Sequence, residues 1–241
     1  MADEIQSSFA RYETKYRLTA AQQAFLERRM QAYMKKDCYG EYTICNLYYD
    51  TEDWQLIRAS IEKPAYKEKL RVRSYGIPGA KDPVFAELKK KYNGIVYKRR
   101  ISIEAEKADA FLSGTIPAER FGQIGRELQW FQLRNNTRPR VYIAYDRTAF
   151  AGMEDPALRI TIDRNIRWRD TDVEFHCGDY GAPLLKPGEA LLEIKSGGAY
   201  PLWLSSALSE AGIFPTSFSK YGVCYCIGIL GSKRKEERIC V

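Results

Sequence analysis

The chain lacks the segments that mark a membrane-spanning or a secreted protein. No apolar run in its 241 residues approaches the roughly 18 residues that cross a bilayer, so we expect no membrane span. The first residues contain no basic segment followed by an apolar one, which argues against secretion. The six cysteines are scattered without the spacing of a metal finger, so we expect reduced thiols and a cytoplasmic location.

Histidine is almost missing. The single one, His176, lies in a segment with Gly and Pro that is typical of a loop. Mechanisms that pair a histidine with a serine or cysteine nucleophile are therefore disfavoured. Any chemistry must come from carboxylates, cations and a metal.

Positive charge is plentiful. Lys and Arg number 38 against 31 Asp and Glu, which gives a net charge of +7. Such a balance indicates a polyanionic partner, either nucleic acid, anionic lipid or phosphates. Composition does not choose among these partners, but the placement of the charges does.

Alternating segments dominate the chain. We expect strands at 9–18, 42–50, 66–75, 84–91, 95–103, 140–150, 158–167 and 189–196. We expect helices at 20–35, 50–61, 105–113, 118–133, 201–211 and 219–230, with Thr19 as the first N-cap. The pattern predicts an α+β fold in which a closed eight-stranded antiparallel β-barrel carries helices packed outside it. We predict a single domain over 1–241, with its core at about 9–230 and a charged tail at 231–241.

Six of the expected strands carry charge on one face and apolar residues on the other. The charged faces hold Glu13 and Lys15; Lys67, Lys69, Arg71 and Arg73; Glu87, Lys89 and Lys91; Lys98 and Arg100; Arg159 and Asp163; Glu193 and Lys195. A solvent-exposed outer face is the ordinary interpretation of such a pattern. A solvent face, however, mixes signs and includes neutral polar residues, whereas these faces are rich in cations. We therefore expect them to line the barrel interior, while the apolar faces receive the helices. Low exposure to solvent is expected in particular for Lys67, Lys69, Arg71, Arg73, Lys89 and Lys91.

An interior with so many cations repels itself unless an anion is present. Arginine forks match phosphate oxygens, and lysine supplies point charge. The few carboxylates fit a divalent cation, because Mg²⁺ takes one or two carboxylates together with substrate phosphates. The constellation predicts a bound metal–triphosphate.

The same residues support a family resemblance. Its segments are RYETKY at 11–16, YYDT at 48–51, KEKLRVRSYG at 67–76, VFAELKKKYNGIVYKRR at 84–100, YDRTAF at 145–150, RITID at 159–163, LLEIK at 191–195 and SFSKY at 217–221. In this order they resemble the catalytic domain of the vacuolar transporter chaperone (VTC) polyphosphate polymerases, within the CYTH or triphosphate tunnel superfamily. The first strand has Glu13-Thr14-Lys15 rather than the ExExK of the triphosphatases and class IV cyclases, which favours the polymerase branch.

The resemblance implies roles for individual residues. With the strand pattern it gives Lys15, Arg71, Arg73, Lys89, Arg147 and Lys220 as catalytic residues, and Lys67, Lys69, Lys91, Lys98, Arg100, Arg159 and Ser219 as phosphate-binding ones. It implies Glu193 as a ligand of Mn²⁺ or Mg²⁺, with Glu87 or Glu13 beside it. Three alternatives stay open. Arg147 lies on the opposite alternation face from Arg140, so a bulge would have to re-aim one of the two. Glu13 could be only a salt-bridge partner. Ser219 could be only a helix N-cap.

The resulting hypothesis is an ATP-dependent polyphosphate polymerase. Its partners would be ATP or another nucleoside triphosphate, and inorganic polyphosphate, pyrophosphate or phosphate. A triphosphatase or tripolyphosphatase would need the same residues, and a non-catalytic polyphosphate-binding module would need most of them. Nucleic acid is disfavoured as a partner, because carboxylates share the cationic faces and aromatic residues for base stacking are missing there.

Overall fold

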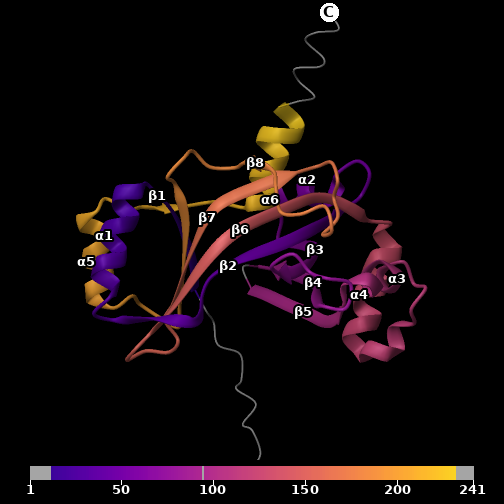
Figure 1. The fold of residues 1–241 in the computed structure, drawn as a ribbon, viewed down its shortest axis with the longest axis horizontal. Helices are drawn as coiled ribbons and strands as arrows, with labels where there is room; N and C mark the ends of the chain where they lie inside the picture. Colours follow the sequence, from indigo (N-terminus) through magenta and orange to yellow (C-terminus); the bar gives the residue numbers. More distant parts are fainter. Residues whose placement is uncertain (1–11, 94, 232–241) are drawn as a thin grey trace, which may run out of the picture. The chain divides into compact units, whose positions relative to one another are not determined.

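The computed structural model describes residues 12–93 and 95–231 (Figure 1). Its strands are β1 Tyr12–Leu18, β2 Met34–Asp50, β3 Tyr66–Tyr75, β4 Pro83–Tyr92, β5 Ile95–Glu104, β6 Arg138–Gly152, β7 Arg159–Arg169, β8 Ala182–Pro183, β9 Ala190–Ser196 and β10 Pro215–Thr216. Its α-helices are α1 Ala20–Met30, α2 Gln55–Ile61, α3 Ala108–Leu112, α4 Gly122–Asn135, α5 Leu202–Glu210 and α6 Lys220–Val223. Two 3₁₀ turns, Ala105–Lys107 and Ala118–Phe121, flank α3, and a π-helical turn, Cys224–Ile229, continues α6. No helix in these described ranges is long and apolar enough to cross a bilayer.

The chain divides into two compact units, each built from separate stretches of sequence. The described part of the first unit is 12–42, 146–165 and 185–218, and that of the second is 43–93, 95–145, 166–184 and 219–231. The long strands β2, β6 and β7 each have residues in both units. The two units are described separately below.

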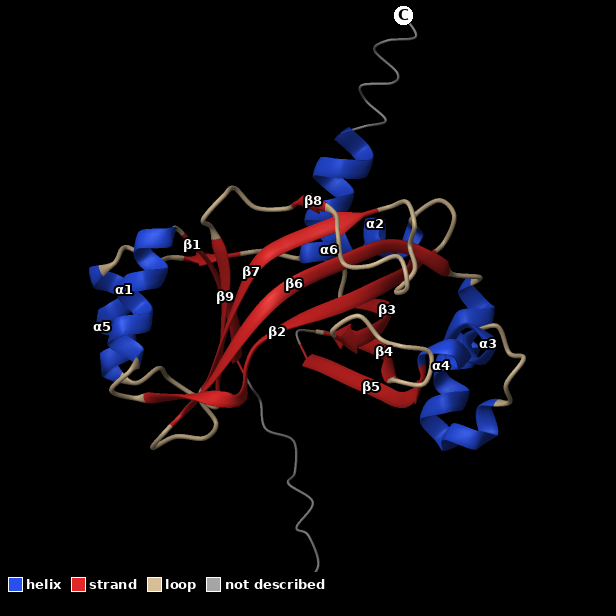
Figure 2. Ribbon diagram, viewed as in Figure 1, coloured by secondary structure: helices blue, strands red, loops and turns tan. Residues whose placement is uncertain are grey.

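All eight expected strands are present, and Figure 2 shows the helices and strands by type. Hydrogen-bonded neighbours follow the order β10-β1-β9-β7-β6-β2-β3-β4-β5, with β8 on β7. The pairs β1–β10, β1–β9, β2–β3, β3–β4, β4–β5, β7–β8 and β7–β9 are antiparallel. The sheet has ten strands, nine in this order and β8 beside it, and the order has two ends, β10 and β5, so the predicted closed eight-stranded barrel is not confirmed. The prediction of one domain over 1–241 stays a prediction, and residues 232–241 of the charged tail lie outside the described residues.

Strand β2 begins eight residues earlier than the sequence pattern indicates. Helix α1 ends at Met30 rather than at 35, and β2 already begins at Met34. The polar segment at 35–41 shows no apolar alternation, so the sequence alone does not reveal a strand there. Gly40, with φ of +69°, supplies a left-handed residue within this part of β2.

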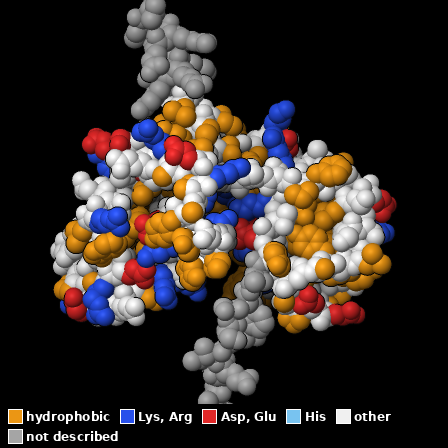
Figure 3. Space-filling model, turned by 180° about the vertical axis from the view of Figure 1, so that it is seen from behind, with side chains coloured by type: hydrophobic (Ala, Val, Ile, Leu, Met, Phe, Trp, Pro, Cys, Tyr) orange, Lys and Arg blue, Asp and Glu red, His pale blue; other side chains and the backbone are white. Residues whose placement is uncertain are grey.

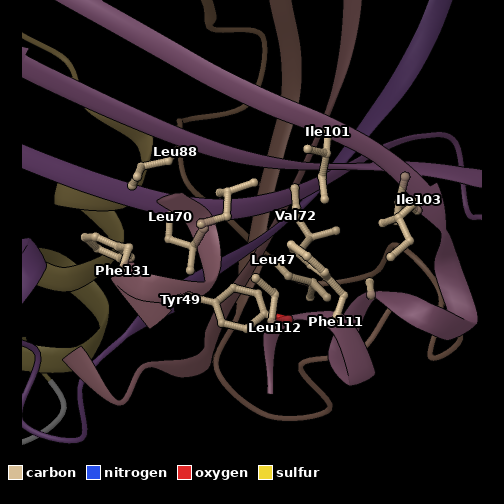
Figure 4. Packing of buried hydrophobic residues seen from close by; sticks show 14 of the residues in the cluster. Leu47, Tyr49, Leu70, Val72, Leu88, Ile101, Ile103, Phe111, Leu112 and Phe131 are labelled. Carbon is tan, nitrogen blue, oxygen red and sulfur yellow. The ribbon is translucent and has the colours of Figure 1, made fainter. Parts of the chain in front are cut away.

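The second unit packs its strands against α3 and α4 (Figure 2). The even-numbered residues Leu70, Val72, Ala86 and Leu88 are fully buried, as expected for the apolar faces of β3 and β4. Figure 4 shows these strands meeting Phe111 and Leu112 of α3 and Phe131 of α4 in one core. Because one face is used by the helices, the odd-numbered residues of β3 and β4 point away from this core.

The first unit repeats this arrangement on a smaller scale. Buried residues of β1, β7 and β9 pack against α1 and α5, which lie beside these strands in Figure 1. The core includes Leu18, Ile160, Leu192, Leu26 of α1 and Leu204 of α5. Thr19 caps α1, as the sequence predicts, with Gln22 completing a capping box. The predicted apolar faces are therefore buried over most of their length in both units. The exceptions are exposed aromatic or aliphatic residues at strand ends, namely Tyr12 of β1, Tyr66 of β3, and Ile95 and Tyr97 of β5.

A buried arginine organises the loop after β7. The Arg169 side chain donates to the backbone oxygens of Asp172, Glu174, Gly178 and Tyr180 at 2.7–2.9 Å. Its guanidinium also lies 3.7 Å from the ring centroid of Tyr142 and 4.5 Å from that of Tyr180. One planar group with five donors thus fixes a segment that has little regular structure.

We expect Arg169→Lys to lower the free energy of unfolding by about 2–4 kcal/mol, because an ammonium cannot reproduce four directed hydrogen bonds. Urea unfolding measures this change, and limited proteolysis should show faster cleavage within 170–181. Arg134→Lys is the matched control, since Arg134 also stacks on a ring, that of Trp130 at 5.0 Å, but is exposed. Equal effects of the two substitutions would contradict the role given to Arg169.

Candidate functional site

The second unit carries a cationic face on the side of β3, β4 and β5 opposite the helices. It is defined by Lys67, Lys69, Arg71, Arg73, Glu87, Lys89, Lys91, Lys98 and Arg100. Arg73 is buried, and Lys67, Lys69, Arg71 and Lys91 are half-buried. Lys89 is exposed, so the prediction of low exposure is wrong for this residue. Lys98 and Arg100 are also exposed. Figure 3 shows Lys and Arg side chains among exposed hydrophobic ones on one face of the molecule.

The strand register places lysines directly opposite lysines on this face. Lys67 pairs with Lys91, Lys69 with Lys89, and Lys89 in turn with Lys98. Burial, followed by the charges of Lys91 and Lys63, lowers the pKa of Lys67. Like charges in directly opposed positions destabilise a sheet. A bound polyanion would turn this repulsion into attraction.

At the other end of the face, two cations share one buried carboxylate. Glu87 is bound by Arg71 at 2.7 Å and by Lys98 at 2.6 Å, and its side chain is 2% exposed. Burial raises the pKa of Glu87, but the charges of Arg71 and Arg73 and the hydrogen bond from Lys98 outweigh it and bring that pKa to about 2. Both carboxylate oxygens are thus engaged by cations. The role of Glu87 as a metal ligand stays a prediction.

Arg73 is held by two residues that the sequence analysis did not assign to the site. Its Nε donates to Asn46 Oδ1 at 3.0 Å, and its Nη2 donates to the Tyr145 hydroxyl at 3.1 Å. Arg71 likewise donates from Nη1 to the Tyr48 hydroxyl at 3.2 Å. Asn46 and Tyr48 alternate with buried Leu47, so the strand pattern could have placed them on this face. These contacts fix the direction of both guanidinium groups.

The start of α6 joins the same face. The Ser219 hydroxyl caps the helix by accepting from Gly222 N at 3.2 Å, and it also accepts from Lys69 Nζ at 3.1 Å. Ser219 is therefore an N-cap and a neighbour of the cations at once. The Lys220 ammonium lies 4.3 Å from the ring centroid of Tyr145.

An anchor beneath α6 holds this segment in place. The Tyr221 hydroxyl donates to Asp50 Oδ2 at 2.7 Å, and the same carboxylate accepts from the backbone N–H groups of Thr51, Leu56 and Ile57 at 2.8–3.0 Å. The Tyr221 ring stacks on Tyr48 at 4.7 Å. Asp50 thereby ties the start of α2 to the segment that carries Ser219 and Lys220.

The first unit contains a quartet of two carboxylates and two lysines, formed by Glu13, Lys15, Glu193 and Lys195. In the register of β1 and β9, Glu13 pairs with Lys195 and Lys15 with Glu193. Lys195 lies 2.8 Å from Glu193 and 3.9 Å from Glu13, and Lys15 lies 3.7 Å and 3.6 Å from the same two carboxylates. Glu13 therefore forms an ion pair with Lys15, and Glu13 and Glu193 share both cations.

Glu193 is the more enclosed of the two carboxylates, with its side chain 10% exposed against 32% for Glu13. Burial raises the pKa of Glu193, but the charges of Lys195, Lys15 and Arg147 outweigh it and hold that pKa well below its usual range. Glu193 therefore stays ionised throughout the neutral range. Its ionised state and the nearby Glu13 suit a divalent cation that takes its remaining ligands from phosphate. Within 12–93 and 95–231, no three His, Cys, Asp or Glu residues group to hold a metal by themselves.

The remaining predicted residues of the first unit differ in their surroundings. Arg147 forms a two-pronged pair with buried Asp163, with Nε–Oδ1 at 2.6 Å and Nη2–Oδ2 at 2.8 Å. Because Tyr142 and Ala144 of β6 pack into a helix-facing core, simple alternation turns Arg147 to the polar face and no bulge is required. Arg159 is exposed and faces Lys195 in the register.

The pKa of Glu87 predicts how stability depends on pH. Because that pKa is lower in the folded protein than the usual value of 4.5, the unfolded chain binds the proton first as the pH falls. The stabilising effect of Glu87 is complete above about pH 4.5 and is lost toward pH 2. We expect Glu87→Gln to remove roughly 2–3 kcal/mol of acid-dependent stability in this window, as seen by urea unfolding at several pH values. Glu104→Gln, which breaks an exposed pair with Lys107, should leave the profile unchanged.

The chain was compared with protein families, curated protein sequences and solved structures. A family model described as the VTC domain matches residues 10–228. Comparison with curated protein sequences gave no match. A solved structure named "putative adenylate cyclase" from Bacillus halodurans is 12% identical over 86% of this chain and 92% of its own, with a TM-score of 0.52, and so supports the fold alone.

Two further solved structures are similar at a lower score. One, named "putative adenylate cyclase" from Vibrio parahaemolyticus, is 11% identical over 92% of this chain and 100% of its own, with a TM-score of 0.49. The other is named "putative adenylyl cyclase" from Hippeastrum, and its description mentions a dominant triphosphatase activity. It is 17% identical over 88% of this chain and 93% of its own, with a TM-score of 0.49.

Proposed function

Because the chain belongs to the VTC domain family, we propose that it is an ATP-dependent polyphosphate polymerase that transfers the γ-phosphate of ATP to a growing inorganic polyphosphate chain. One observation carries the proposal: Lys67, Lys69 and Lys89 each face another lysine across a strand pair. A regular row of positive charge suits a ligand that is itself a regular row of negative charge.

Three aromatic rings beside the cations favour phosphate over bases as the ligand. Arg71 lies 6.0 Å from the ring centroid of Tyr48, Arg100 lies 5.0 Å from that of Phe85, and Lys220 lies 4.3 Å from that of Tyr145. Cations therefore approach the ring faces on which a base would stack. The proposal accordingly excludes nucleic acid as the polymer.

Arg71 and Arg73 are the residues we assign to the triphosphate. Their guanidinium groups are already oriented by Tyr48, Asn46 and Tyr145, so little freedom is lost when phosphate oxygens arrive. The lysine pairs would hold the polyphosphate chain. Phosphoryl transfer needs positioning and charge stabilisation more than covalent chemistry, which suits a site without histidine.

Glu193 and Glu13 are the residues we assign to a divalent cation, Mn²⁺ or Mg²⁺. When bound, such a cation neutralises the charge that develops on the phosphate oxygens. Lys15 and Lys195 align both carboxylates across β1 and β9, and their charges lower the pKa of Glu193. Arg147, held by Asp163, adds positive charge near Glu193.

The deciding experiment is incubation of the purified protein with ATP and Mn²⁺. Long-chain polyphosphate together with ADP would support the polymerase. Free phosphate with ADP would instead indicate a triphosphatase, which needs the same phosphate-binding residues and differs only in the acceptor. Polyphosphate binding without turnover, with any nucleoside triphosphate or metal, would leave a binding module.

We also expect polyphosphate affinity to fall steeply with salt. If about six lysines and arginines neutralise phosphates, affinity should drop on the order of 1,000-fold between roughly 50 and 200 mM salt. Titration of a labelled polyphosphate at several salt concentrations measures the slope. Affinity that does not depend on salt would contradict binding through the cationic face.

A further inference from the structure

The second unit has a pocket that involves none of the residues assigned above. It lies where β4 begins and β5 ends, beside the 3₁₀ turn Ala118–Phe121, and its volume is about 380 Å³. That volume falls within the range of roughly 300–1,000 Å³ typical of small-molecule sites. Nine residues line it, and they combine positive charge with an apolar floor.

The charge in the pocket is unbalanced. Lys81, Lys107 and Arg120 line it against a single carboxylate, Glu104. Lys107 pairs with Glu104 at 2.7 Å, so one cation is neutralised. The side chains of Lys81 and Arg120 make neither an ion pair nor a hydrogen bond with any residue of 12–93 or 95–231. Two cations beside one cavity are therefore available to an anion.

The floor of the pocket is apolar and partly aromatic. Ile103 belongs to the helix-facing core, and Ile116 and Phe121 pack against that core from outside. The Phe121 ring meets Phe111 edge-on at 4.9 Å, which fixes its orientation. A ring or another flat apolar group would bury the apolar surface of these side chains, whereas an inorganic ion would leave it exposed to water.

The walls are held by hydrogen bonds, so the pocket exists without a ligand. The backbone of 80–82 receives hydrogen bonds from Ala105 N and Glu106 N at 3.0 Å each. Gln129, which is 9% exposed, donates to Phe111 O at 2.7 Å and to Ile116 O at 2.5 Å. A site that is already formed loses little entropy when it binds a ligand.

We propose that this pocket binds an aromatic anion, a phosphate or carboxylate attached to a flat apolar ring. Arg120 and Lys81 bind the anionic group, and the ring lies over Ile103, Ile116 and Phe121. Neither part alone accounts for the lining: inorganic phosphate leaves the floor unused, and an uncharged ring leaves two cations unpaired.

Phenyl phosphate is the probe, and the isoleucine methyl groups of the intact chain are the reporters. In NMR titrations, phenyl phosphate should shift the methyl signals of Ile103 and Ile116 in a saturable manner. At equal ionic strength, inorganic phosphate and benzyl alcohol should each bind at least about 10-fold more weakly, because each lacks one of the two interactions. Arg120→Ala and Lys81→Ala should each weaken phenyl phosphate binding about 10-fold.

Arg126→Ala is the control, since Arg126 is an exposed arginine of α4 that does not line the pocket. It should leave the affinity for phenyl phosphate unchanged. Unshifted Ile103 and Ile116 signals, or unchanged affinity in Arg120→Ala, would overturn the proposal. Equal affinity for inorganic phosphate would overturn the assignment of the ligand class. None of these measurements requires the protein to polymerise phosphate, so the outcome is independent of the proposed activity.

Discussion

Replacing Glu193 by glutamine should lower ATP turnover with Mn²⁺ by about two to three orders of magnitude while the protein still folds and binds polyphosphate. Glu193 is an ionised carboxylate beside Lys15, Lys195 and Arg147, and a carboxylate repels phosphate unless a cation intervenes. Glutamine keeps the shape of the side chain and removes its charge. Polyphosphate affinity should therefore stay the same or rise.

The measurements are ATP turnover over a range of Mn²⁺ concentrations and polyphosphate affinity by titration. If Glu193 holds the metal, the substitution should also raise the Mn²⁺ concentration needed for half-maximal rate. Glu13→Gln should have a smaller effect, because its side chain is more exposed. Glu189→Gln is the control, since Glu189 pairs with Arg17 at 2.5 Å at the edge of the same strands. Full turnover in Glu193→Gln would remove Glu193 from the metal site.

Alternation in the sequence was enough to predict the two faces of each main strand. Leu70 and Val72 of β3 are buried against helices, and Lys69 and Arg71 lie on the opposite face, as the period of two requires. The resemblance to the VTC family is confirmed by the match over 10–228. Both predictions depend on the order of residues along short segments, which can be read directly from the sequence.

The partners of each charge could not be predicted in the same way. The pairing of Lys67 with Lys91 depends on the register between β3 and β4, and the binding of Arg147 by Asp163 joins two different strands. A strand pattern says which face a residue occupies but not which residue lies opposite. Closure of the sheet likewise depends on whether its two end strands pair with each other, which local alternation does not show. Here the prediction of a closed barrel is not confirmed.

Glu87 illustrates the consequence for assigning roles. From the pattern alone it is one carboxylate among cations, and it suits a metal ligand as well as a counter-ion. In the structure its two oxygens lie within ion-pair distance of Arg71 and Lys98, so it balances part of their charge. Glu193 and Glu13, by contrast, lie close enough to share Lys15 and Lys195. The proposal therefore assigns the metal first to Glu193 and Glu13.

Arg73→Ala should weaken polyphosphate binding and ATP turnover together, unlike Glu193→Gln. The Arg73 guanidinium is buried and aimed by Asn46 and Tyr145, and in the proposal it binds phosphate before and during transfer. Losing a charge-assisted, two-pronged contact should lower polyphosphate affinity roughly 30-fold, at about 2 kcal/mol. The ratio of kcat to KM for ATP should fall by at least the same factor.

Arg73→Lys separates the charge of this residue from its geometry. Lysine keeps the positive charge but loses the planar fork, so it should restore part of the polyphosphate affinity and less of the turnover. Arg138→Ala is the matched control, because Arg138 pairs with Glu52 at 2.9 Å on the surface of the same unit. Unfolding midpoints of all three variants identify any loss that is due to stability. If Arg73→Ala lowers turnover and leaves polyphosphate affinity intact, then Arg73 acts only in the transfer step and the ground-state role assigned to it is wrong.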